Sequence, residues 1–105
     1  MKLTNLQLGE YRLSAQASQQ IREIGRFTKR RWGIYQAQAY HAGLERTFGL
    51  LADFPKMGVA VDELLAGARR FRFQSHNTSY TEDGGSILIR AVFHVSQALR
   101  PELFS

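Results

Sequence analysis

Three histidines, four tyrosines and an excess of arginine and lysine are the side chains of this 105-residue sequence that could do chemistry. The histidines, His41, His76 and His94, show none of the short spacings typical of zinc or iron ligands. The sequence has no cysteine, which excludes disulfides, thiolate catalysis and zinc ribbons. It lacks a GxSxG serine motif, and the pair Gly84-Gly85 precedes a predicted strand, so it forms no phosphate loop. We therefore expect no catalytic residue of these kinds, no metal and no cofactor.

Basic residues form two clusters in a chain of formal net charge +5. Such a balance favours an acidic partner: nucleic acid, an acidic peptide or the ribosome. In the first cluster, Arg22, Arg26, Lys29 and Arg30 follow helical spacing. Like charges at this spacing repel slightly, so the cluster gains from an acidic partner. A solvated surface without a partner is the other interpretation.

The second cluster, Arg69, Arg70 and Arg72, lies on a predicted strand. Because neighbouring strand residues point to opposite faces, Arg70 and Arg72 should point together, while Arg69 shares a face with Phe71. Arginine side chains bind carboxylate and phosphate groups through two parallel hydrogen bonds, which suits this cluster to recognition. The alternative is an exposed strand that charge keeps soluble.

An RNA-cleaving site is a further hypothesis. It requires a general base, a general acid and a group that stabilises the phosphorane charge. Four side chains are of types that could fill these roles: Arg72, His76, Tyr80 and His94. Tyr80 and His94 are better interpreted as residues in or beside the core.

Composition predicts one domain over residues 1–105, since 44% of the residues are hydrophobic and the chain is long enough for a single core. Its apolar runs are too short to span a membrane, and the first residues do not resemble a signal peptide. We therefore expect a cytoplasmic protein. Residues 1–8 are expected to form a flexible lead-in, and residues 96–105 a weakly patterned C-terminal tail.

Periodicity predicts a short strand at residues 10–13, followed by two helices. Ser14 is the expected N-cap of a helix from Ala15 to Trp32, because its hydroxyl can accept a hydrogen bond from a free backbone N–H. Gly33 ends this helix, and a second runs from Ile34 to about Phe54. So short a link implies an antiparallel helical hairpin.

Three strands are predicted after a connector at residues 56–67. They cover residues 68–74, 78–82 and 86–95, with a hairpin turn at Asp83-Gly84-Gly85. The predicted fold class is therefore α+β: an N-terminal strand, an antiparallel helical hairpin and a three-stranded, mostly antiparallel sheet with the helices on one face.

Several motifs occur in a characteristic order between Tyr11 and about His94. They are Tyr11-Arg-Leu-Ser14, Ile21-Arg-Glu-Ile24, Trp32-Gly33, Leu50-Leu-Ala-Asp-Phe-Pro55, Gly58, Arg69-Arg-Phe-Arg72, Ser75-His76, Tyr80, Ile87-Leu-Ile-Arg90 and Val92-Phe-His94. In this combination the sequence resembles the ParE toxins of the RelE/ParE superfamily of type II toxin–antitoxin systems.

The resemblance implies a RelE/ParE-like fold and a toxin that is not itself an enzyme. It implies a toxin that inhibits DNA gyrase by trapping it on cleaved DNA, with no sequence-specific nucleic-acid binding of its own. It also implies a ParD-like antitoxin, with a ribbon-helix-helix part and an acidic C-terminal segment that wraps the toxin. The expected antitoxin-binding residues are Arg22, Arg26, Arg69, Arg70, Phe71, Arg72 and Tyr80. The expected target-binding residues are Arg90, His94 and Arg100.

Two alternatives stay open at this stage. One is a ribosome-dependent mRNA endoribonuclease of the RelE type. In that branch an arginine commonly follows the histidine that matches His76, whereas this sequence has Asn77 there. The other is an inactive toxin that acts only as a partner of its antitoxin, because the usual tail pattern of ParE toxins is blurred over Gln97-Ala-Leu-Arg-Pro-Glu102.

Overall fold

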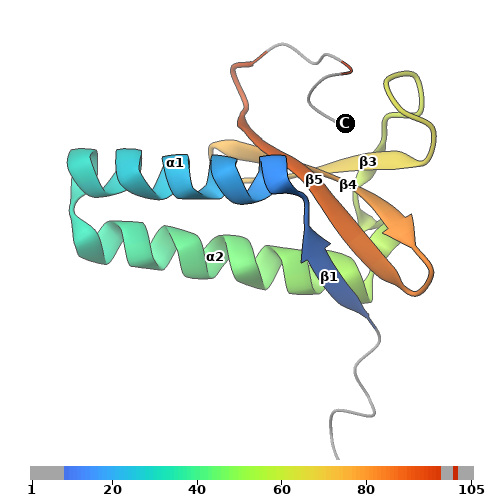
Figure 1. The fold of residues 1–105 in the computed structure, drawn as a ribbon, viewed down its shortest axis with the longest axis horizontal. Helices are drawn as coiled ribbons and strands as arrows, with labels where there is room; N and C mark the ends of the chain where they lie inside the picture. Colours follow the sequence, from blue (N-terminus) through green and yellow to red (C-terminus); the bar gives the residue numbers. More distant parts are fainter. Residues whose placement is uncertain (1–8, 98–100, 102–105) are drawn as a thin grey trace, which may run out of the picture.

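Two antiparallel helices cover one face of a five-stranded sheet (Figure 1). The computed structural model describes residues 9–97 and residue 101. The predicted lead-in at residues 1–8, Arg100 and most of the predicted tail lie outside the described residues. In the part of the chain that is described, no helix has both the length and the apolar character needed to cross a membrane.

The N-terminal half follows the sequence prediction closely. Strand β1 (Glu10–Leu13) leads into helix α1 (Ala15–Trp32), and the Ser14 hydroxyl accepts a hydrogen bond of 3.0 Å from the Ala17 N–H. Gly33 separates α1 from α2 (Ile34–Asp53) with a φ of 96°, a value that glycine adopts without the strain of a side chain. The expected N-cap and helical hairpin are therefore confirmed.

The C-terminal half contains more strands than expected. A short 3₁₀ helix, η2 (Pro55–Met57), precedes β2 (Val59–Ala60), β3 (Ala68–Phe73), β4 (His76–Asp83) and β5 (Ser86–His94). The strand order is β1-β5-β4-β3-β2, with β1 parallel to β5 and the other pairs antiparallel. The α+β class is confirmed, but four strands follow the hairpin instead of three, and β1 joins them to make a five-stranded sheet. The two-residue β2 is too short to show alternation in the sequence, and β1 joins the sheet through a partner distant in the chain.

The main core lies between the helices and the sheet. Its buried members are Ala17, Ile21, Leu44, Phe48, Leu51, Ala52, Tyr80, Ile87, Ile89 and Val92. Phe71 and Phe73 pack against it from β3, and we call this side of the sheet the helix-covered face. On the opposite, outer face, Val61, Ala68, Ala91 and Phe93 form a smaller cluster beneath the connector between β2 and β3.

A β-bulge at Arg90 connects β5 to the start of α1. Ser79 pairs with Ala91 but Tyr80 pairs with Ile89, which leaves Arg90 as the extra residue of β5. The Arg90 carbonyl accepts hydrogen bonds from the Ser14 hydroxyl at 2.8 Å and from the Gln16 amide at 3.1 Å. The bulge therefore fixes helix α1 relative to the strand that carries Arg90.

Candidate functional site

The outer face of the sheet holds the arginines of β3 that the sequence predicts to point together. In the β3–β4 register, Arg70 lies opposite Ser79 and Arg72 opposite Asn77. Arg69 lies opposite Tyr80, a residue of the main core. Directly opposite residues share a face, so the predicted division of the second basic cluster is confirmed.

Arg90 joins Arg70 and Arg72 on this side of the sheet. Its Nε donates a hydrogen bond of 3.0 Å to the Thr81 hydroxyl, and Thr81 pairs with Ala68 of the outer cluster. Since β3 and β5 flank β4, the two strands that carry these arginines lie about 10 Å apart, twice the usual spacing between strands. We call the set of Arg70, Arg72 and Arg90 the arginine face.

The arginine face retains donors that no acidic side chain occupies. Among the residues described, the ion pairs are Arg12–Asp83, His41–Glu45 and Lys56–Glu82, and none involves this face. Arg72 donates from Nε to the Gln74 carbonyl at 2.6 Å, while the buried Arg70 Nε has no hydrogen-bond partner within residues 9–97. Guanidinium groups bind carboxylate and phosphate ligands, and no acidic side chain within residues 9–97 neutralises the guanidinium groups of this face.

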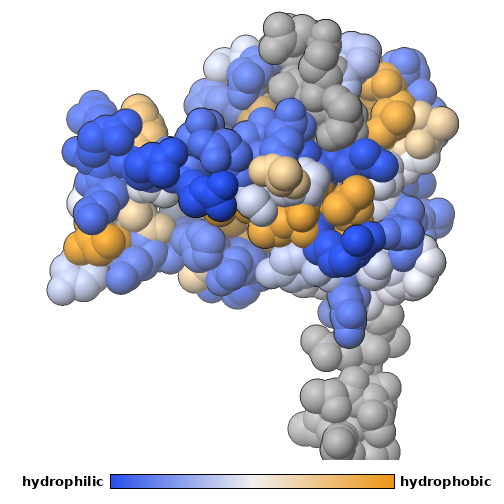
Figure 2. All heavy atoms as spheres, in the orientation of Figure 1, coloured by the Kyte–Doolittle hydropathy of each residue, from blue (hydrophilic) through white to orange (hydrophobic). Residues whose placement is uncertain are grey.

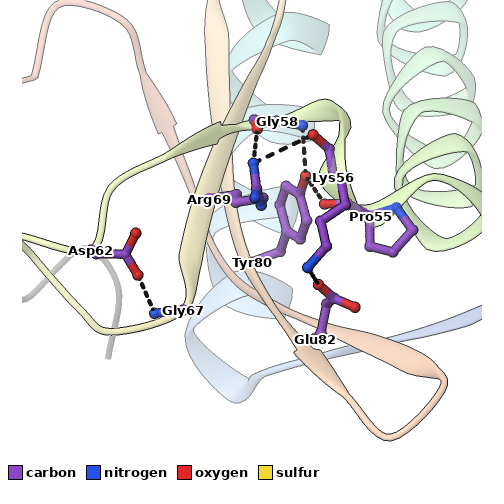
Figure 3. A network of polar contacts seen from close by, with 8 residues as sticks. All are labelled: Pro55, Lys56, Gly58, Asp62, Gly67, Arg69, Tyr80 and Glu82. Atoms are coloured by element: carbon purple, nitrogen blue, oxygen red, sulfur yellow. Dashed lines mark hydrogen bonds and ion pairs between the residues drawn. The ribbon is translucent and has the colours of Figure 1, made fainter.

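Arg69 and Tyr80 instead hold the chain after α2 in place (Figure 3). The Tyr80 hydroxyl donates to the Pro55 carbonyl at 2.8 Å and accepts from the Gly58 N–H at 2.9 Å. Arg69 donates to the Gly58 carbonyl at 2.7 Å. Tyr80 is 1% exposed, and its burial raises the pKa of the phenol. Both side chains are thus engaged within the fold, and Tyr80 lies in the core as the periodicity suggests.

The remaining predicted antitoxin residues lie away from the arginine face. Arg22 and Arg26 are exposed on α1, and Arg22 donates to the Gln19 amide oxygen at 2.9 Å. Phe71 is half-buried against the main core. The structure therefore divides the predicted set into an outer arginine face, an exposed ridge on α1 and a group on the helix-covered face.

A second polar group joins three elements at the end of the sheet, and it contains His76 and His94 of the hypothetical RNA-cleaving set. The Tyr40 hydroxyl of α2 lies 2.7 Å from His76 Nδ1, and the rings of His76 and His94 are 5.5 Å apart. The His94 Nδ1 also contacts the Ser96 hydroxyl at 2.8 Å. His94, which was expected in or beside the core, lies beside it and is exposed, because β5 ends there at the rim of the sheet.

His76 and His94 also border a cavity of about 300 Å³ between α1 and the end of β5. Its other lining residues are Gln20, Glu23, Ile24, Phe27, Val92, Phe93 and Gln97. Burial, with a smaller effect of His94, lowers the pKa of His76 to about 4, so the imidazole is neutral at pH 7. Within the described ranges, no three His, Asp or Glu side chains converge to hold a metal ion.

Comparison with known proteins relates this chain to one family by sequence and to a solved structure by fold. A family model for the ParE toxin of type II toxin–antitoxin systems, parDE, matches residues 11–99. Toxin ParE1 of Caulobacter vibrioides is 36% identical over 93 residues, which is 89% of this chain and 96% of the relative. Toxin ParE1 of Mycobacterium tuberculosis is 35% identical over 85 residues, 80% of this chain and 87% of the relative. In fold, the chain is similar to a structure titled "Chromosomal ParDE TA system from P. aeruginosa", with a TM-score of 0.72 at 13% identity, covering 86% of this chain and 99% of the other.

Proposed function

This chain belongs to the family of ParE toxins of type II toxin–antitoxin systems, and from that premise we propose that it inhibits DNA gyrase and is neutralised by an acidic, ParD-like antitoxin. In this proposal the toxin is not an enzyme: it binds gyrase and traps it on cleaved DNA.

The arginine face is the observation that carries the antitoxin part of the proposal. Arg70 and Arg72 lie together on the outer face of the sheet, and neither forms an ion pair among the described residues. An acidic segment that folds on binding supplies the carboxylates that these guanidinium groups lack. Arg22 and Arg26 offer further positive charge on α1, so a segment long enough to pass around the sheet can use both surfaces.

Arg90 suggests how such a segment would neutralise the toxin. It is one of the proposed gyrase-binding residues, with His94 and Arg100, and it lies on the same face as Arg70 and Arg72. An antitoxin segment bound to Arg70 and Arg72 would therefore cover Arg90. Neutralisation then follows from occlusion, without a change in the toxin's fold.

The antitoxin interface is tested by the affinity of the purified toxin for the proposed ParD-like antitoxin. Replacing an arginine that forms charge-assisted hydrogen bonds costs about 1.5–3 kcal/mol, so we expect Arg72→Gln to weaken binding by about 10–100-fold. Arg46→Gln removes the same charge from an exposed position on α2 and serves as the matched control, with an expected change below about twofold. Equal affinities for wild type and for a combined Arg70→Ala and Arg72→Ala variant would overturn this placement.

Gyrase inhibition has its own test in the supercoiling reaction. Arg90→Gln should raise the toxin concentration needed for inhibition, whereas Arg46→Gln should not. Circular dichroism of each variant shows whether the fold is intact. If Arg90→Gln, shown to be folded, inhibits supercoiling as well as wild type, Arg90 is not a gyrase contact.

The alternative of a RelE-type nuclease receives less support. Tyr80 is 1% exposed and both of its hydroxyl contacts are internal, so this hydroxyl is not available to a substrate. With a pKa of about 4, His76 is also a weaker base than proton abstraction near pH 7 favours. Toxin-dependent cuts in ribosome-bound mRNA would nevertheless establish the nuclease. The inactive-toxin alternative is excluded if expression without antitoxin arrests growth.

A further inference from the structure

The end of the helical hairpin is a basic surface with no acidic residue. We define the hairpin tip as residues 27–35, the last turns of α1, Gly33 and the start of α2. Its cations are Lys29, Arg30 and Arg31, and all three are exposed. None of them pairs with a carboxylate among residues 9–97. The charge at this tip is thus not balanced within the fold.

The same tip exposes aromatic rings that the core does not use. Trp32 is 63% exposed and Tyr35 is 84% exposed. The guanidinium carbon of Arg31 lies 4.6 Å from the centre of the Trp32 ring and covers one of its faces. A flat ligand can therefore stack on the other face of Trp32, with Tyr35 only three residues further along the chain.

The tip projects away from the sheet, at the left end of the hairpin in Figure 1. In the space-filling view, strongly hydrophilic side chains gather over the α1 side of the hairpin and apolar atoms lie at its left end (Figure 2). The cations and the rings of the tip belong to one projecting surface, which a partner must bend around in order to contact both. It suits a flexible polymer that carries both negative charge and flat rings, because such a polymer can bend around the tip.

We propose that the hairpin tip binds single-stranded nucleic acid. Lys29 and Arg30 contact phosphates, and bases stack on Trp32 and Tyr35. Stacking and phosphate contacts do not depend on base identity, so this binding is not sequence-specific. The surface is separate from the arginine face, which lies on the far side of the sheet from the helices, and the inference is independent of the proposed action on gyrase.

Trp32 makes the contact directly observable, because it is the single tryptophan of the chain. A thymidine 12-mer titrated into the whole protein should quench tryptophan fluorescence as bases stack on the ring. The same oligonucleotide with a fluorescein label gives the affinity by anisotropy. Duplex DNA of equal length and a glutamate 12-mer are titrated separately for comparison. We expect quenching by the single strand, weaker quenching by the duplex and none by the peptide.

Three variants locate the binding site. Lys29→Gln combined with Arg30→Gln should weaken oligonucleotide binding by about tenfold. The slope of the logarithm of the binding constant against the logarithm of the salt concentration should become shallower by about 1.4, which is about 0.7 for each of the two phosphates that are no longer neutralised. Tyr35→Ala should weaken binding by about tenfold, because a base can no longer stack on its ring. Arg46→Gln, which removes one charge elsewhere on the hairpin, should change affinity less than about twofold.

Three results would overturn the inference. The protein does not bind the oligonucleotide, the tip variants bind it as tightly as wild type although circular dichroism shows them folded, or Arg46→Gln weakens binding as much as the Lys29/Arg30 variant does. Tighter binding of the glutamate peptide would identify the tip as a site for an acidic protein instead. Equal affinity for duplex and single strand without quenching would overturn the stacking contact.

Discussion

Tyr80→Phe removes one oxygen atom from a buried position and tests whether this tyrosine is structural or functional. The hydroxyl accepts from the Gly58 N–H at 2.9 Å and donates to the Pro55 carbonyl at 2.8 Å. Gly58 is buried, so its N–H finds no water when the hydroxyl is removed, whereas Pro55 is half-exposed and its carbonyl loses less. The cost is therefore set mainly by one unsatisfied buried donor.

Leaving a buried backbone donor unpaired costs about 1–3 kcal/mol, and we expect a loss of about 2 kcal/mol in the free energy of unfolding. At about 4–8 °C per kcal/mol for a domain near this size, the melting temperature should fall by about 8–16 °C. Urea unfolding at pH 7, followed by fluorescence, measures the first quantity, and calorimetry measures the second. The urea m-value should not change, because the same surface is exposed on unfolding.

Tyr35→Phe is the matched control, since it removes the same oxygen from a side chain that is 84% exposed. Its free energy of unfolding should change by less than about 0.5 kcal/mol. Folded Tyr80→Phe should bind antitoxin and inhibit gyrase like wild type. A variant with unchanged stability that no longer arrests growth would refute the structural assignment of Tyr80. Toxin-dependent mRNA cuts that disappear in this variant would favour the nuclease.

Two further predictions concern packing and pH. Gly43→Ala should destabilise the fold by about 1–3 kcal/mol, because the new Cβ would overlap the Phe73 ring. Gly49→Ala, which has open space around the new Cβ, should instead stabilise the fold by up to about 1 kcal/mol through its higher helix propensity. Urea unfolding of both variants measures the two changes. Folding lowers the His76 pKa from 6.5 to about 4. Between these two pH values the unfolded chain binds a proton that the folded protein does not, so the free energy of unfolding should decrease as the pH drops from about 6.5 to 4. In His76→Gln the urea midpoint should fall less over this pH range than in wild type, whereas in His41→Gln, a change at an exposed position, it should fall as in wild type. If the midpoint falls equally in both variants, the loss of stability does not come from His76.

Local chemistry made the helical hairpin predictable from the sequence. The Ser14 hydroxyl and the positive φ of Gly33 act within a few residues of their own positions, so the helix ends could be assigned without any knowledge of the fold. The parallel pairing of β1 with β5 could not be assigned this way, because Tyr11 and its partner Ile87 lie far apart in the chain, with the whole helical hairpin between them. The Tyr40–His76 contact joins residues 36 positions apart and has no signal in the sequence.

The candidate site was predictable in part. Strand alternation alone placed Arg70 and Arg72 on one face. The same rule fails along β5, where strict alternation from Ile89 would put Val92 on the outer face. The bulge at Arg90 returns Val92 to the main core, and it also turns the Arg90 carbonyl toward the start of α1. Sequence pattern therefore identifies residues that share a face but not the interruptions that tertiary contacts impose.

The most direct test of the proposed function is a gyrase cleavage assay with the purified, folded toxin. Plasmid DNA, gyrase and ATP are incubated with increasing toxin, and each sample is divided before electrophoresis, with and without protease digestion. We predict loss of supercoiling and linear DNA that appears only after digestion, with both effects reversed by the antitoxin. Unimpaired supercoiling at all toxin concentrations, with no linear DNA after digestion, would contradict the proposal that this ParE-family toxin acts by trapping gyrase on cleaved DNA.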